Sequence, residues 1–86
     1  MERMDIIARS TRQLGAAIRR NRRHKELTQQ ALGELMHARQ ATVSKLEAGA
    51  PATQLQVLMD ALAALDLELI VRPRTKSSVA DIEDLF

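Results

Sequence analysis

The side chains best suited to specific chemistry are amides, hydroxyls and basic groups gathered in the middle of this sequence. Gln29 and Gln40 each carry an amide, which donates and accepts hydrogen bonds and therefore holds two neighbouring polar atoms of a ligand at once. Ser44 adds a hydroxyl, and Arg39 and Lys45 add cations. Amides and cations at these positions favour the recognition of a polar, anionic surface over the making or breaking of covalent bonds.

Reactive and metal-binding groups are scarce. The 86 residues include no Cys, Trp or Tyr and a single Phe, which excludes disulfides, thiolate zinc sites, cysteine nucleophiles and aromatic platforms for stacking bases. His24 and His37 stand 13 positions apart without carboxylates at ligand spacing, so we predict no metal site. Neither a nucleophile with its base nor a glycine-rich phosphate loop is present, so we predict no enzyme activity and no cofactor.

Two short helices are predicted to carry the amide and hydroxyl groups. Thr28 is a good N-cap for a helix over residues 29–36, and a further run over 39–48 is followed by Gly49, a residue type common just after helix ends. Gly33 is small enough for a close crossing of the two helices. Their inward apolar positions are predicted to be Leu32, Leu35, Met36, Ala38, Val43 and Leu46. Two short helices crossing steeply form a helix-turn-helix.

A longer helix is predicted on each side of this pair. The first runs from about residue 11 to 24, and Ser10 with Gln13 matches a capping box at its start. Thr53 with Gln56 matches a second capping box ahead of the fourth helix. The apolar residues of that helix recur at spacings of three and four, namely Leu55, Leu58, Met59, Leu62 and Leu65. The fold class is therefore all-α.

Residues 67–72 change the hydrophobic period to two and stop at Pro73, which predicts one short strand. A lone strand leaves backbone groups unpaired, and the same strand of a second copy across a twofold axis would satisfy them. The apolar residues of this predicted dimer strand are Leu67, Leu69, Ile70 and Val71. The alternative is that the segment extends the fourth helix or packs irregularly.

Charge divides the chain into a basic body and an acidic tail. All 13 Lys and Arg lie within residues 1–76, whereas residues 77–86 hold three acidic side chains and no basic one. We therefore predict one domain over 1–74 and an acidic, flexible tail over 75–86. Five basic residues crowd into seven positions, which favours a polyanion such as nucleic acid or, alternatively, a solvated helix face. They are Arg19, Arg20, Arg22, Arg23 and Lys25.

No apolar run approaches the roughly 18 residues that a membrane span needs. The first ten residues, MERMDIIARS, mix charged and apolar positions as no secretory signal does. We therefore expect a cytoplasmic protein without a membrane segment.

The stretch from residue 28 to 49 resembles the Cro/repressor-like (XRE) helix-turn-helix family. The matching positions are Thr28, Gln29, Gly33, Gln40, Thr42, Ser44, Leu46, Glu47 and Gly49, and the resemblance extends over about residues 11–65. It implies a compact domain of four to five helices that binds double-stranded DNA. In such a domain the second helix of the pair lies in the major groove.

The family resemblance also implies roles for individual side chains. Gln40 would pair with an adenine through both atoms of its amide, and Arg22 with Glu47 would form a structural ion pair. The implied base-reading residues are Gln40, Ala41, Ser44, Lys45 and Arg39. The expected phosphate contacts are Gln29, Thr42, Arg19 and Arg23. For each contact the alternative is an ordinary polar surface residue.

Two positions depart from the family pattern. His37 stands where the turn usually has glycine, because the backbone there needs a positive φ. Ala38 and Arg39 offer no side-chain acceptor for capping the second helix. The first residue of that helix is therefore left open.

The segment LELIVRPR after the fourth helix is most similar to HipB-type antitoxins. That resemblance implies a bacterial, nucleoid-associated homodimer that binds a palindromic operator, represses its own operon and binds a HipA-type Ser/Thr kinase toxin. In some such operons a third protein neutralises the toxin. The alternatives are a free-standing XRE-family repressor without a toxin, and a protein-interaction module that has lost its DNA contacts.

Overall fold

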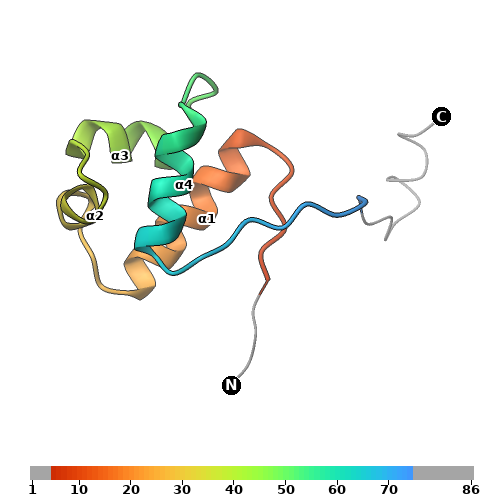
Figure 1. Cartoon of the computed structure of the whole chain (residues 1–86), viewed down its shortest axis with the longest axis horizontal. Coiled ribbons are helices and arrows are strands. Elements are labelled where there is room, and N and C mark those ends of the chain that lie inside the picture. Colours follow the sequence, from red (N-terminus) through yellow and green to blue (C-terminus); the bar gives the residue numbers. More distant parts are fainter. Residues whose placement is uncertain (1–4, 75–86) are drawn as a thin grey trace.

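Four helices surround one apolar core in the computed structural model, which describes residues 5–74 (Figure 1). They are α1 (Thr11–His24), α2 (Gln29–Met36), α3 (Gln40–Glu47) and α4 (Leu55–Ala64). The helix-turn-helix consists of α2 and α3, with α1 packed against α3 and α4 packed against α2. The predicted all-α fold is confirmed. Within the described residues no helix is both long and apolar enough to cross a membrane.

The core takes side chains from every helix. Its buried members are Ile18, Leu32, Met36, Val43, Leu46, Leu58, Ala61, Leu62 and Leu65. Because α2 and α3 have only eight residues each, they are too short to be stable alone and depend on this shared burial.

Two helices begin with the predicted side-chain caps. The hydroxyl of Ser10 accepts a hydrogen bond from the backbone N–H of Gln13, and that of Thr28 accepts one from Ala31. Each cap satisfies a donor that the first helical turn leaves without a partner.

The predicted capping box at the start of α4 is wrong. The hydroxyl of Thr53 donates to the carbonyl of Ala50 at 2.8 Å, closing the preceding turn, so it does not cap the helix. The N-cap is Gln54, which makes no side-chain capping bond, and Gln56 donates to Asp60 along the helix. The local turn competes successfully for the hydroxyl.

All four helices end in the same backbone motif. A residue with positive φ follows each helix, and the next N–H donates to a carbonyl five residues back, as in a Schellman motif. The four residues are Glu26 (φ 59°), His37 (φ 57°), Gly49 (φ 79°) and Asp66 (φ 58°). Three of these helix ends therefore place a side chain in a conformation that favours glycine.

The apolar stripe of α2 is wider than the surface that covers it. Leu35 was predicted to face inward, but it is 56% exposed. Leu32 and Met36 fill the contact with the core, and Leu35 lies about 100° around the helix from Met36. Leu55 and Met59 of α4 are exposed for a similar reason, at 68% and 44%.

The segment after α4 is neither helical nor part of a strand ladder within the described residues. Because Asp66 turns the chain out of the helix, the alternative that residues 67–72 continue α4 is wrong. Leu67 still packs against the core, and the chain then runs away from the helices as far as Arg74 (Figure 1). Pairing of this segment with a second copy stays a prediction, and the predicted tail 75–86 lies outside the described residues.

Candidate nucleic-acid interface

The start of α3, which the sequence left open, is at Gln40. Arg39 is the N-cap, with extended backbone angles and no side-chain capping bond. Its carbonyl accepts hydrogen bonds from Thr42 and Val43, at 3.0 and 3.3 Å. The side chain of Arg39 therefore lies just ahead of the first turn, and the amide of Gln40 leads the helix.

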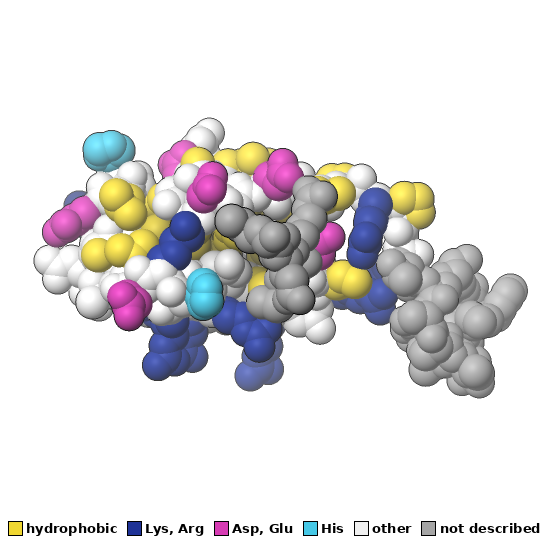
Figure 2. Space-filling model, turned by 90° about the horizontal axis from the view of Figure 1, so that it is seen from below, with side chains coloured by type: hydrophobic (Ala, Val, Ile, Leu, Met, Phe, Trp, Pro, Cys, Tyr) yellow, Lys and Arg dark blue, Asp and Glu magenta, His cyan; other side chains and the backbone are white. Residues whose placement is uncertain are grey.

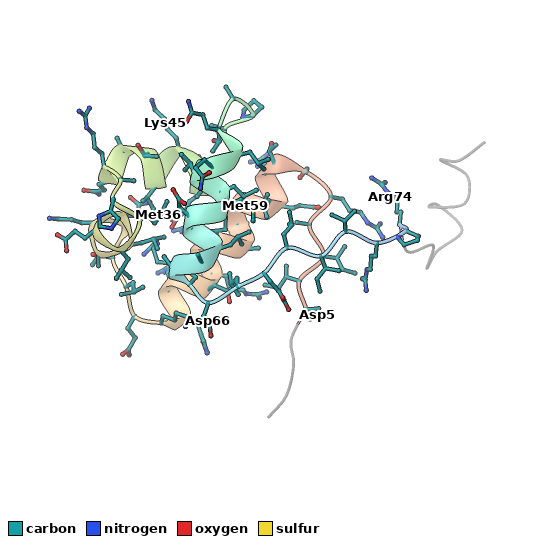
Figure 3. All side chains as sticks on the ribbon, in the orientation of Figure 1. Asp5, Met36, Lys45, Met59, Asp66 and Arg74 are labelled. Atoms are coloured by element: carbon teal, nitrogen blue, oxygen red, sulfur yellow. The ribbon has the colours of Figure 1, made fainter. Side chains whose placement is uncertain are left out.

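One face of α3 is polar and uncovered. The predicted base-reading residues on it are exposed, namely Gln40, Ala41, Ser44 and Lys45. Their spacing places them on a common side of the helix, and Arg39 is exposed immediately before them. Figure 3 shows Lys45 projecting from α3 at the opposite side from Met36, which lies between α2 and α4. Thr42 is half-buried at the edge of this face.

The amide of Gln29 joins this face to the interior. Its Nε2 donates to Glu47 Oε1 at 3.2 Å, and its Oε1 accepts from Gln40 Nε2 at 3.5 Å. A carboxylate only accepts hydrogen bonds, so the contact with Glu47 fixes which way the Gln29 amide points. Gln40 is then left with its second amide hydrogen and its oxygen for a ligand.

An ion pair at the far end of α3 completes the chain of contacts. Arg22 Nε donates to Glu47 Oε2 at 2.5 Å, and Arg22 Nη2 donates to Glu47 Oε1 at 3.0 Å. Arg22 Nη1 also donates to the carbonyl of Leu27 at 2.7 Å. The structure thus brings together the two residues that the sequence paired, and they tie α1 to the end of α3.

Two glycines that the sequence analysis did not assign to this contact allow the helices to approach. A Cβ atom on Gly15 would lie 2.5 Å from the carbonyl oxygen of Leu46 and 2.6 Å from that of Glu47. On Gly49 it would lie 2.5 Å from Cα of Arg12. A glycine in the middle of a helical pattern was the available signal for the first of these contacts.

Most of the arginines of α1 are exposed. The exposed arginines of α1 are Arg12, Arg19, Arg20 and Arg23. Figure 2 shows Lys and Arg side chains projecting from the lower edge of the molecule, whereas most of the acidic side chains on this face lie above them; further Lys and Arg side chains stand at the right. Arg22 is the buried exception. The predicted phosphate residues Arg19 and Arg23 are therefore available to a ligand.

Two short helices that pack against each other, the second of which presents an uncovered polar face, are typical of a helix-turn-helix protein. In this chain they are α2 and α3. Residues 2–73 match the family described as "Helix-turn-helix domain", and the chain belongs to that family. No curated protein matches the chain significantly.

Several solved structures are similar to this chain, with HipB prominent among them. A HipB point variant in complex with an O2 20mer has a TM-score of 0.77 and 26% identity, covering 84% of this chain and all of that one. A chain of the HipA-HipB-O2-O3 complex and one of the HipB-O4 20mer complex each have a TM-score of 0.75 and 26% identity. Each comparison covers 80% of this chain and 97% of the other. The predicted similarity to HipB is confirmed.

Proposed function

We propose that this chain is a sequence-specific DNA-binding repressor of the HipB type. The observation that carries the proposal is the uncovered face of α3, with Gln40 held by Gln29 at its leading end. A helix with such a face fits the major groove of DNA. The similarity to HipB chains in complex with O2 and O4 20mers supports the same function.

On DNA, Gln40 pairs with an adenine edge, and Ala41 meets a thymine methyl group. Ser44 and Lys45 reach further base edges, and Arg39 reaches a base or a phosphate. The backbone and amide of Gln29 at the start of α2 bind a phosphate, where helical N–H groups favour an anion. Thr42, Arg19 and Arg23 add further phosphate contacts.

The protein acts as a homodimer on a palindromic operator. A dimer joined through residues 67–72 presents two α3 helices, and binding to successive major-groove faces requires them to lie about 34 Å apart. This assignment divides the chain into a DNA-binding and dimerisation domain over 1–74 and a tail over 75–86. It also places the protein in the bacterial cytoplasm, on the nucleoid.

The second part of the proposal is that the chain binds a HipA-like Ser/Thr kinase toxin and represses the operon encoding both. Support comes from the similar chain in the HipA-HipB-O2-O3 complex. A shallow groove of about 570 Å³ lies between α2 and α4, lined by Leu35, Met36, His37, Asp60, Ala63 and Ala64. Leu35 is about 9 Å along α2 from Gln29, and none of the residues lining this groove belongs to α3.

Two other functions compete with this one, a free-standing repressor and a pure protein-interaction module. A free-standing repressor has the same DNA face and no toxin, and in a three-protein operon another chain neutralises the toxin. A pure protein-interaction module would not need the arrangement of Gln29 and Gln40. An enzyme is disfavoured by the helix-turn-helix fold and its similarity to HipB.

The test is purification of the tagged protein from its native operon, with co-purifying chains identified by mass and bound DNA sequenced. An operator fragment with a kinase supports the full proposal, whereas DNA alone supports the free-standing repressor. Leu35→Asp is expected to lose the kinase and keep the DNA. Leu55→Asp, also at an exposed leucine but outside the groove, is the matched control. If Gln40→Ala with Lys45→Ala leaves every interaction intact, DNA reading by α3 is excluded.

A further inference from the structure

The carboxylate of Glu47 is buried, yet only one side chain separates it from the leading residue of the α3 face. Its Oε2 accepts a hydrogen bond from Arg22 Nε, and its Oε1 accepts from Arg22 Nη2 at 3.0 Å. The same Oε1 also accepts from Gln29 Nε2 at 3.2 Å. Because Glu47 is buried, it does not touch a ligand on that face, and its influence there passes through Gln29.

The charge of Glu47 orients two amides in turn. A carboxylate has acceptors only, so the end of the Gln29 amide that faces Glu47 is its nitrogen. The oxygen of Gln29 then meets Gln40, which donates from its own nitrogen at 3.5 Å. If the Gln29 amide turned over, its oxygen would face the carboxylate of Glu47, and two acceptors would be brought together without a hydrogen between them.

This orientation determines which groups of Gln40 remain for a base. One hydrogen of its amide nitrogen is directed at Gln29, so the other hydrogen and the amide oxygen form the free edge. A donor beside an acceptor matches adenine, which presents the acceptor N7 and the donor N6–H in the major groove. Guanine presents two acceptors, N7 and O6, and requires both amide hydrogens. Only the reversed orientation of Gln40, with its oxygen toward Gln29, would free both.

We infer that Glu47 is a positioning residue that makes Gln40 select adenine over guanine, acting through the amide of Gln29. The inference rests on the proposed function and adds to it a determinant of base preference that does not contact DNA. Glu47 then has two separable roles. Its ion pair with Arg22 stabilises the packing of α1 on α3, and its contact with Gln29 rejects the wrong base.

Glu47→Gln tests the role of the charge, because it keeps the size of the side chain but replaces one acceptor with a donor. Gln29 can then take either orientation, since the new amide can both accept from it and donate to it. We expect the preference for adenine over guanine to fall from about tenfold to within about threefold. The ratio of the two affinities is the readout, because partial unfolding weakens binding to both duplexes by the same factor. A purely structural role of Glu47 would leave that ratio unchanged.

Gln29→Lys makes the opposite change and leaves the ion pair of Arg22 and Glu47 in place. A lysine has donors only, so it still satisfies Glu47 but turns the oxygen of Gln40 toward itself. Both amide hydrogens of Gln40 then face the base, and the preference should reverse to favour guanine by about threefold or more. Gln30→Lys adds the same charge at the exposed neighbouring position of α2. It is the matched control and should keep the preference for adenine.

The probe is a DNA duplex that the full wild-type chain selects from a randomised pool, with each position varied in turn and binding measured by fluorescence anisotropy. The base pair read by Gln40 is the one at which Gln40→Ala loses its preference. A wild-type chain that selects no sequence overturns the proposed function and the inference together. The inference alone is overturned if the Gln40 position does not favour adenine, or if Glu47→Gln keeps the wild-type ratio. It is also overturned if Gln29→Lys prefers adenine as Gln30→Lys does.

Discussion

Arg22 and Glu47 form a bidentate ion pair, and their side chains are only 10% and 3% exposed. The same carboxylate accepts the amide of Gln29, whose oxygen in turn accepts the amide of Gln40. Among the described residues no buried polar side-chain atom lacks a hydrogen-bond partner. The orientation of the residue that leads the α3 face is thus linked, through three side chains, to the packing of α1.

Breaking the ion pair between Arg22 and Glu47 should lower the stability of the fold substantially. We expect Arg22→Ala or Glu47→Ala to lower the free energy of unfolding by about 3–5 kcal/mol, because each leaves a buried charge without its partner. Urea denaturation monitored by circular dichroism measures the loss. Lys45→Ala, an exposed change on the same helix, should cost less than about 0.5 kcal/mol. The double change Arg22→Met with Glu47→Leu should recover most of the stability, and equal losses in the single and double variants would contradict this account.

Gln40 and Gln29 should affect DNA binding differently. Gln40→Ala is expected to remove about 1–3 kcal/mol of discrimination at one base pair and leave binding to other sequences nearly unchanged. Gln29→Ala should weaken binding to all sequences, because it removes a phosphate contact, and should also lose part of the discrimination at that base pair, because it releases the Gln40 amide. Since the two amides touch, the double variant should lose less discrimination than the sum of the single losses. Fluorescence anisotropy on the operator and its single-base variants tests this, and strict additivity would show that Gln29 does not position Gln40.

The bounds of α1 and α2 follow from signals that the sequence displays locally. Ser10 and Thr28 each sit where their hydroxyls cap a helix, and Gly49 supplies the positive φ after α3. The family resemblance added the pair of Arg22 and Glu47, which periodicity alone does not indicate.

Other features were missed, some because they depend on distant contacts and some because a local turn competes for the same group. Leu35 has the periodicity of a core residue, but whether it is covered depends on where α4 crosses α2. Thr53 has the form of a cap, yet its hydroxyl closes the preceding turn. Glutamate does not by its type indicate a left-handed conformation at position 26. The hydrogen bonds of the Schellman motif around Glu26 impose that conformation. The orientation of the Gln29 amide required the position of Glu47.

The strained helix ends offer a gain in stability. Glu26→Gly should raise the free energy of unfolding by about 0.5–1 kcal/mol, because glycine adopts its φ of 59° without the steric penalty of a side chain. His37→Gly should give a smaller gain, since histidine tolerates this region better than glutamate. Lys25→Gly, one residue earlier with a φ of −87°, is the control and should be destabilising. A gain from Lys25→Gly equal to that from Glu26→Gly would contradict the backbone explanation.

A methyl group added at Gly15 should separate α1 from α3. We expect Gly15→Ala to lower the free energy of unfolding by about 1–3 kcal/mol, although alanine is the better helix former, because its Cβ would overlap two backbone carbonyls. The exposed neighbour Ala16 provides a control for helix propensity. Ala16→Gly should lower the free energy of unfolding by about 1 kcal/mol, because glycine is the poorer helix former. Thermal unfolding of both variants measures the effects. A stabilising Gly15→Ala would show that the two helices can move apart freely.

The arginines on the outer side of α1 should contribute to DNA affinity without contributing to sequence preference. We expect Arg19→Ala and Arg23→Ala each to reduce the slope of log affinity against log salt concentration by about one, because each removes one phosphate contact. The base preference measured on operator variants should stay the same in both. Arg22→Lys is a useful comparison, because this side chain is buried against Glu47 and should leave the salt slope unchanged in whatever fraction remains folded. Titrations between about 50 and 200 mM salt cover the range in which such contacts change affinity strongly. An unchanged slope in Arg19→Ala and Arg23→Ala would leave α1 outside the DNA interface and confine the phosphate contacts to Gln29 and Thr42.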